Sequence, residues 1–308
     1  MIDQKELNNL IYLLDDTDLD IIRQVEDKIL SLGIEAITFL EDAAKAEDEL
    51  ISLERGQTLI RRLKRDSIIN ELKLWSVQDE PDLLQGMLIL ERIEFPYVDE
   101  AEINRQLEKI KLDAWLELNY DLTSFEQIKI LNYIFFQVHH FKGNTEEYHD
   151  AHNSFLSRVL EHRTGNPISM AIVYSLIAQR LNIPVYGVNL PQHFVLGYRS
   201  EEGLEIIRRF NDPSALGMGM TGDVMFYINP FSEGLILNHE SLSSFLEQLN
   251  ITPREEYFRV CTNVEIIQRV LRNLVFSYQK TEEMEKADLA QRLLIHLSGN
   301  PNNPVIED

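Results

Sequence analysis

The 308-residue chain has little cysteine, little basic charge and no long apolar run, and each shortage excludes a class of protein. Its single cysteine, Cys261, excludes an intrachain disulfide framework and any cysteine-rich zinc or iron–sulfur site. The 29 basic side chains face 51 acidic ones, a net charge of −22 that disfavours a nucleic-acid partner. No apolar stretch approaches the ~18 residues of a membrane span, and no signal-peptide pattern opens the sequence. We therefore expect no membrane partner and a cytoplasmic protein.

The chain is rich in sequence patterns typical of amphipathic helices. From residue 1 to about 117, apolar side chains recur three and four positions apart, which is typical of helices that bury one face. The first sixty residues hold five basic and fifteen acidic side chains, so the outer faces of these helices are acidic. No clean sequence period repeats, but paired acidic helices indicate a helical-repeat-like arm suited to a protein partner.

The middle of the chain contains two helix starts with clear capping signals. Thr123, three residues before Glu126, forms a capping-box pattern ahead of a strongly apolar helix. Asn166 and Pro167 are typical of a helix start, because Asn caps well and proline lacks the N–H that would need a partner there. The helix that they open runs to about residue 182 and is apolar on nearly all sides, which predicts a buried central helix.

After the central helix the apolar pattern shortens to that of β-strands. The predicted strands span 185–190, 194–199, 204–209, 224–228 and 235–237. Further helices are predicted at 151–162, 254–279 and 282–298. The predicted fold is α+β and mostly helical, with a small, mostly antiparallel sheet. We divide the chain into a helical arm over 1–117, a core over 118–250, and a C-terminal helical hairpin with a polar tail over 251–308.

Residues 148–234 carry a set of short motifs in a fixed order. The motifs are Asn153-Ser154-Phe155-Leu156, the run VLEHRTGNPIS from Val159 to Ser169, Leu190-Pro191-Gln192-His193-Phe194, Ile228-Asn229-Pro230-Phe231, and Gly234. Their order and spacing resemble the SirB-type branch of the transglutaminase-like superfamily. The resemblance implies a papain-like core, in which a central helix packs on an antiparallel sheet.

The resemblance also implies a catalytic arrangement in active members of that superfamily. A Cys at the start of the central helix attacks, a His takes its proton and an Asp orients the His. The helix N-terminus favours the thiolate because it carries about half a positive charge. Carried over residue by residue, the nucleophile position falls on Pro167, the histidine on His193 and the Asp position on Asn229. Proline has no thiol, so the resemblance implies that the nucleophile is absent.

Several side chains near these positions are candidates to line the cleft. The expected lining residues are Arg163, Asn166, Pro167, Ser169 and Gln192. Ser169 is either a hydroxyl that satisfies the helix start, which we favour, or a substitute nucleophile. His193 is either a relic bonded to Asn229 or a ligand-binding histidine. Arg163 either binds an anion or, more simply in so acidic a chain, forms an internal salt bridge.

One segment rich in acid and histidine is a candidate metal site. Its possible ligands are Glu147, His149, Asp150 and His152. Two histidines three residues apart converge on a helix face, yet acidic residues are favoured at a helix start without any metal. We prefer the surface helix start and expect neither a metal nor a cofactor. Cys261, far along the chain, is expected to be a small buried apolar side chain.

Three functions follow from these observations. The favoured one is a non-catalytic module for interaction or regulation, which uses the acidic helices, a relict cleft around His193, or both. The second is a cryptic hydrolase or acyltransferase that uses Ser169 or a water with His193 and Asn229. The third is a helical-repeat adaptor. A Ser169 hydroxyl within reach of a His193 ring nitrogen would favour the enzyme, and a large exposed apolar patch on the arm would favour the adaptor.

Overall fold

The structure is a computed structural model that describes residues 4–14, 16, 18–33, 36–37, 40–41, 53–199 and 224–298. The chain divides into two compact units, Met1–Leu74 and Trp75–Asp308, and each is described by itself. The division into arm, core and hairpin at residues 117 and 250 follows family motifs rather than compactness, and it stays a prediction. The strand predicted at 204–209 lies outside the described residues.

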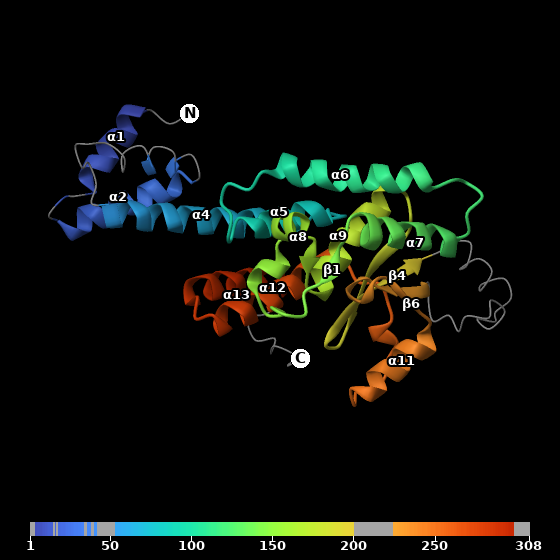
Figure 1. The fold of residues 1–308 in the computed structure, drawn as a ribbon. Helices are drawn as coiled ribbons and strands as arrows, with labels where there is room; N and C mark the ends of the chain where they lie inside the picture. The colour runs from blue at the N-terminus through green and yellow to red at the C-terminus, as the bar shows by residue number, and fades with distance from the viewer. Residues whose placement is uncertain are drawn as a thin grey trace. The chain divides into compact units, whose positions relative to one another are not determined.

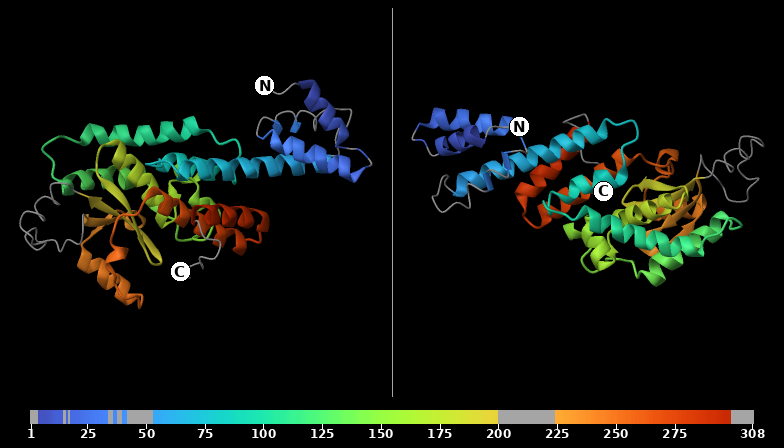
Figure 2. Two further views of the ribbon diagram at one scale, coloured as in Figure 1. Left: turned by 180° about the vertical axis from the view of Figure 1, so that it is seen from behind. Right: turned by 90° about the horizontal axis from the view of Figure 1, so that it is seen from above.

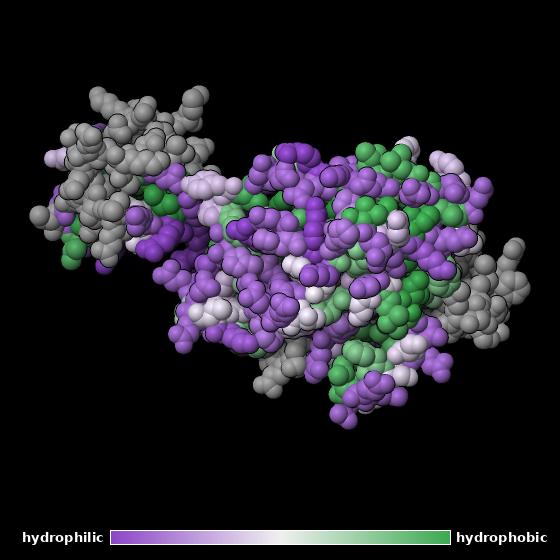
Figure 3. All heavy atoms as spheres, in the orientation of Figure 1, coloured by the Kyte–Doolittle hydropathy of each residue, from purple (hydrophilic) through white to green (hydrophobic). Residues whose placement is uncertain are grey.

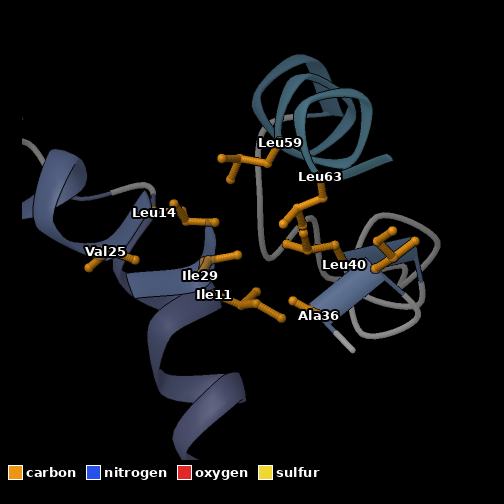
Figure 4. Close-up of a cluster of buried hydrophobic side chains, with 9 residues drawn as sticks. Ile11, Leu14, Val25, Ile29, Ala36, Leu40, Leu59 and Leu63 are labelled. Carbon is orange, nitrogen blue, oxygen red and sulfur yellow. The ribbon is translucent and has the colours of Figure 1, made fainter. Parts of the chain in front are cut away.

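The described part of the first unit is helical, as predicted. It includes α1 (Gln4–Leu13), α2 (Leu19–Ser31) and the part of α4 (Leu53–Ser76) that ends at Leu74. Asp18 caps α2, because its side chain accepts the N–H of Asp20. The buried faces of these helices meet in one apolar cluster (Figure 4). Its members are Ile11, Leu14, Val25, Ile29, Ala36, Ile37, Leu40, Leu59 and Leu63.

In the second unit, helices α5 (Leu83–Glu91), α6 (Glu100–Glu117) and α7 (Ser124–Asn132) precede the core. The predicted capping box is present at α7, where Thr123 and Glu126 satisfy each other's backbone N–H groups. A π-helical turn, η1 (Tyr133–Val138), continues α7. The short strand β1 (Lys142–Gly143) then pairs in parallel with β2 (Thr164–Gly165), just before the central helix.

The central helix is α9 (Pro167–Arg180), and its burial agrees with the prediction. Residues 167–178 are all buried, since α9 contacts α6, α8 (Leu156–His162) and the sheet on different sides. Asn166 caps the helix and Pro167 occupies its first position, as the sequence predicts. A helix enclosed in this way has no solvent face, so every side chain along it is constrained by packing.

The sheet has four antiparallel strands in the order β3 (Val185–Leu190), β4 (His193–Arg199), β5 (Val224–Asn229) and β6 (Leu235–Leu237). Helices α9 and α11 (His239–Gln248) lie on opposite faces of it (Figures 1 and 2). The α11 face is apolar, with Val188, Leu190, Val195, Val224, Tyr227, Leu242, Leu246 and Phe258 buried together. The antiparallel order brings the start of β4 and the end of β5 to the same end of the sheet.

Two predicted helices have different bounds in the structure. The helix predicted at 151–162 is divided into a 3-10 turn, η2 (Ala151–Ser154), and α8, because Phe155 between them is extended. The helix predicted at 254–279 begins later, as α12 (Asn263–Lys280), where Thr262 and Glu265 form a capping box. Helix α13 (Met284–Ser298) packs against α12 and completes the predicted hairpin.

Polar side chains cover most of the visible surface, with apolar ones gathered over α6 and α7 (Figure 3). Leu112, Trp115 and Leu116 near the end of α6 are exposed. None of the helices in the described ranges is both long enough and apolar enough to cross a bilayer.

Gly234 should be intolerant of any side chain. Its φ is +72°, and an added Cβ would lie 2.2 Å from the Asn132 side chain. Asn132 cannot yield, because its Nδ2 donates to the Gly234 carbonyl at 2.9 Å and its Oδ1 accepts the buried Tyr174 hydroxyl at 2.8 Å. We expect Gly234→Ala to lower the free energy of unfolding by about 2–4 kcal/mol in urea titrations. Glu233→Gly, at a neighbouring position with φ +50°, should change it by less than about 1 kcal/mol, and equal losses in both variants would contradict this account.

Candidate functional site

The candidate site is centred on His193 and Asn229, which the sheet brings together. The Asn229 Nδ2 atom lies 3.1 Å from His193 Nε2. Asn229 is buried, while His193 is half-buried with its ring against Phe245 of α11, at a centroid distance of 5.4 Å. The hydrogen bond considered from the sequence is thus present, and the role of the pair stays a prediction.

The other hydrogen bonds of Asn229 determine which ring nitrogen of His193 carries the proton. Asn229 Oδ1 accepts the Phe231 N–H at 3.1 Å, so its Nδ2 faces the imidazole and also donates to Ser232 Oγ at 3.1 Å. An amide N–H directed at Nε2 needs a lone pair there, so the neutral ring carries its proton on Nδ1. Burial lowers the pKa of His193, and the positive charge of Arg269 also lowers it. At pH 7 the imidazole is neutral, and its basic nitrogen already accepts a hydrogen bond.

The start of the central helix is closed by its own residues. Asn166 Oδ1 accepts the Ser169 N–H at 3.0 Å, and Ser169 Oγ accepts the Asn166 N–H at 3.1 Å. Pro167, between them, is buried and has no N–H to offer. A free helix start presents N–H donors and the positive end of the dipole to a nucleophile or an anion. Here the Asn166–Ser169 capping box occupies that place.

The capping box is the end of a longer buried network. Asn166 Nδ2 donates to Ser154 Oγ at 2.9 Å. The neighbouring Asn153 accepts from Asn144 Nδ2 at 2.9 Å and donates to the Glu147 carbonyl at 2.6 Å. Each polar group left without its partner in such a buried place costs about 1–3 kcal/mol. The network therefore holds residues 144–154 firmly against the start of α9.

Ser169 and His193 are directed to different partners. Ser169 is fully buried, and its hydroxyl also lies 3.2 Å from the Asn166 carbonyl oxygen. His193 Nε2 is bonded to Asn229 instead. In the part of the chain that the structure describes, no hydrogen bond joins the two. The contacts match a hydroxyl that satisfies the helix start, rather than a nucleophile activated by a base.

Arg163 and Gln192 both adopt left-handed backbone conformations, with φ values of 58° and 59°, and Gln192 directly precedes His193. The Arg163 guanidinium lies over the Phe141 ring, 4.9 Å from its centroid, and its Nη1 is buried without a hydrogen-bond partner among the described residues. The expected internal salt bridge is likewise not found there. Desolvation lowers the pKa of Arg163. Gln192 is exposed in the two-residue turn between β3 and β4.

The residues of the candidate metal site have other partners. His152 Nδ1 lies 2.9 Å from Asp150 Oδ1, and Asp150 also caps η2 by accepting the His152 N–H. The His149 ring packs between Tyr148 and Phe276, with both centroid distances 5.2 Å. Across the described ranges, no three potential ligand side chains converge. Asp150 thus caps a short 3-10 turn, and the choice between a helix start and a metal site stays a prediction.

Cys261 lies away from the start of the central helix, at the edge of the sheet. Its N–H and its Sγ both contact the Gly187 carbonyl, at 2.8 and 3.2 Å. Burial raises the pKa of the Cys261 thiol to about 12, so the reactive thiolate is almost absent at neutral pH. This thiol does not replace a nucleophile at Pro167.

Sequence reasoning missed several partners of the site. The Asn229–Ser232 contact could have been predicted from the sequence, because a serine three residues after an asparagine can accept a hydrogen bond from its amide. Ser154 belongs to a quoted motif, but nothing in the motif connects it to Asn166. No sequence pattern connects Arg269 with His193, since only the tertiary structure brings α12 near this histidine.

Comparisons with known proteins agree with the geometry. The model of the transglutaminase-like superfamily matches residues 101–272. The UPF0162 protein of Xylella fastidiosa (strain 9a5c) is 29% identical over 240 residues, covering 76% of this chain and 79% of that protein. Protein SirB1 of Salmonella typhimurium is 27% identical over 229 residues, covering 72% and 75%. F-box only protein 21 of Mus musculus is 31% identical over 159 residues, covering 51% of this chain but 22% of that protein. No solved structure matches.

Replacing Asn229 by Asp should reverse the protonation preference of His193. A carboxylate keeps the acceptor for the Phe231 N–H and places a negative charge beside Nε2, which favours imidazolium. The His193 pKa should rise by at least one pH unit, equivalent to a tenfold gain in proton affinity. Titration of its ring signals by NMR measures this shift, with Ser232→Ala as a control that leaves no new charge. A pKa at or below that of the wild type would contradict the close contact between the side chain of residue 229 and His193 Nε2.

Cys261 should resist thiol reagents in the folded protein. With the thiol protonated and hydrogen-bonded to Gly187, its reaction with Ellman's reagent at pH 8 should be about 100-fold slower than that of free cysteine. Adding denaturant should release one thiol per chain at the free rate. Fast reaction of the native protein would show that the thiol is less protected than its contacts indicate.

Proposed function

We propose that this chain, which belongs to the transglutaminase-like superfamily, is a non-catalytic module for protein interaction or regulation. The observation that carries the proposal is the closed start of the central helix. In active members the resemblance places a thiolate there, whereas this chain has Pro167 flanked by a buried Asn166–Ser169 capping box. A substrate carbonyl would have to displace that box to reach the helix end.

The histidine supports the same proposal. A general base needs a free nitrogen within reach of the nucleophile's proton. His193 Nε2 instead accepts from Asn229, and Ser169 is fully buried elsewhere in the core. The pair is best explained as a structural remnant that ties the end of β5 to the start of β4.

One relative carries the matched core within a longer chain. In F-box only protein 21 of Mus musculus, the matched segment is 22% of a much longer chain, so the core there is one part of a larger protein. In the present chain we propose that the helical arm over 1–117 and the hairpin over 251–308 flank the core over 118–250. The acidic arm offers charge to a basic partner.

An assay of acyl chemistry tests the absence of catalysis. The full chain is incubated with p-nitrophenyl acetate, and separately with a glutamine peptide and an amine, beside His193→Ala and Ser169→Ala. We expect wild type and both variants to match the buffer rate. Turnover above buffer that disappears in either variant would overturn the proposal and establish the cryptic hydrolase or acyltransferase.

The same Ser169→Ala variant should reveal the structural role of the hydroxyl. Its loss leaves the buried Asn166 N–H without a partner, so the free energy of unfolding should fall by about 1–3 kcal/mol. Ser241→Ala at the third residue of α11, an exposed position, should change it by less than about 0.5 kcal/mol. Unchanged stability of Ser169→Ala would remove the capping argument.

A further inference from the structure

The outer side of α6 carries three large apolar side chains, here called the α6 patch. Leu112 is 52% exposed, Trp115 59% and Leu116 67%. They lie three and four residues apart, so they share one side of the helix. The opposite side faces the core and consists of the buried residues Ile103, Leu107, Ile110 and Ala114. Apolar side chains gather over this part of the surface in Figure 3.

The size of the α6 patch indicates a weak protein interface. With each side chain more than half exposed, the patch presents on the order of 350 Å² of surface, comparable to the largest apolar patch of an ordinary monomer. A standard stable interface buries about 800 Å² on each partner. Trp115 lies at the centre of the patch, and tryptophan is among the residue types that most often dominate binding.

Most charged side chains of α6 around the patch have partners within the chain. Their ion pairs and hydrogen bonds are Arg105–Glu102, Lys111–Glu108, Arg180–Glu108 and His139–Asp113. Lys109, before the patch, and Glu117, after it, are exposed, and neither side chain has an ion pair with any residue that the structure describes. Lys109 also lowers the pKa of His139 through its positive charge, which is repulsion rather than pairing. The patch is therefore bordered by one unpaired cation and one unpaired anion.

The positions of these two charges favour a second copy of the chain as the partner. Lys109 and Glu117 lie in one i, i+4 row that passes through Asp113 along one flank of the patch. A partner of a single charge sign would attract one of them and repel the other. If a second α6 packs antiparallel about a two-fold axis near Asp113, Lys109 of each copy lies opposite Glu117 of the other. The same axis lays the two apolar patches against each other.

We propose that the protein forms a weak homodimer in which the α6 patches of two copies pack antiparallel. Leu112, Trp115 and Leu116 form the apolar centre, and two reciprocal Lys109–Glu117 ion pairs set the register. Such an interface uses the same surface on both copies, so it closes at two. The inference goes beyond the proposed function, because self-association does not depend on whether the core is catalytic.

Sedimentation velocity of the full chain from about 1 to about 200 µM tests the dimer. The weight-average mass should rise with concentration from that of the 35.9 kDa monomer toward twice that value. Trp115→Ala with Leu116→Ala should raise the dissociation constant at least about tenfold, because the centre of the interface is lost. Val77→Ala with Met284→Ala removes side chains that are 78% and 62% exposed elsewhere in the same unit, and should leave it within about twofold of wild type. Equal melting temperatures show that the variants remain folded.

Charge reversal tests the antiparallel register. Lys109→Glu alone, or Glu117→Lys alone, places like charges opposite each other twice in a homodimer and should weaken it at least about tenfold. An equimolar mixture of the two single variants restores both ion pairs between unlike copies, so it should associate more tightly than either variant alone. Lys109→Glu with Glu117→Lys in one chain keeps both pairs in reversed order and should dimerise within about threefold of wild type. Lys280→Glu, at the exposed end of α12, controls for net charge and should have no effect.

Each outcome supports or overturns the dimer. A chain that stays monomeric up to about 200 µM would overturn it and leave the patch to a different protein. A dimer that Trp115→Ala with Leu116→Ala does not weaken, or that the control variants weaken equally, would also overturn it. A mixture of the single charge variants that associates no better than each alone would exclude the antiparallel second copy. These results do not bear on acyl activity, whereas turnover that depends on His193 would overturn the proposed function and leave the dimer unaffected.

Discussion

The reciprocal hydrogen bonds between Asn166 and Ser169 are the constraint on which the rest of this core depends. They begin a helix whose residues 167–178 are all buried, so that no solvent can satisfy its first N–H groups. A buried helix start must be satisfied by protein atoms, and here the protein atoms are its own. The same bonds occupy the Asn166 and Ser169 N–H groups, two donors that would otherwise face a group bound at the helix start. The start of the central helix is thus stabilised from within the core.

Polar side chains connect the capping box to the segments around it. Ser154, Asn153 and Asn144 connect it to the loop that carries Tyr148. On the other side of the site, Asn229 joins His193 to the turn that carries Phe231. Buried polar groups are costly unless paired, so these networks leave few alternative conformations. Phe231 and Tyr148 are consequently carried by segments that these hydrogen bonds hold in place.

Much of the fold could be predicted because local signals agreed with one another. Each of three local patterns predicts a single structure. These patterns are the capping box at Thr123, the helix start at Asn166–Pro167 and the apolar residues on all sides of the central helix. The predicted strands at 185–190 and 235–237 have the bounds that the structure gives. The prediction failed where helical periodicity continued across a break. Phe155 fits the apolar pattern of 151–162, yet it adopts an extended backbone, and residues before Asn263 fit the pattern of α12 without joining it.

By itself, the sequence determined the α+β class, the buried central helix, its cap and the absence of a cysteine beside it, because these depend on neighbours within a few residues. Tertiary structure alone decided which side chains face each other. Antiparallel pairing placed Asn229 beside His193, and the path of α12 brought Arg269 near the imidazole. Among the described residues, the Arg163 guanidinium packs on the Phe141 ring rather than pairing with a carboxylate. Such contacts join residues with no periodic relation in the chain, so their partners become definite only when packing fixes three-dimensional distance.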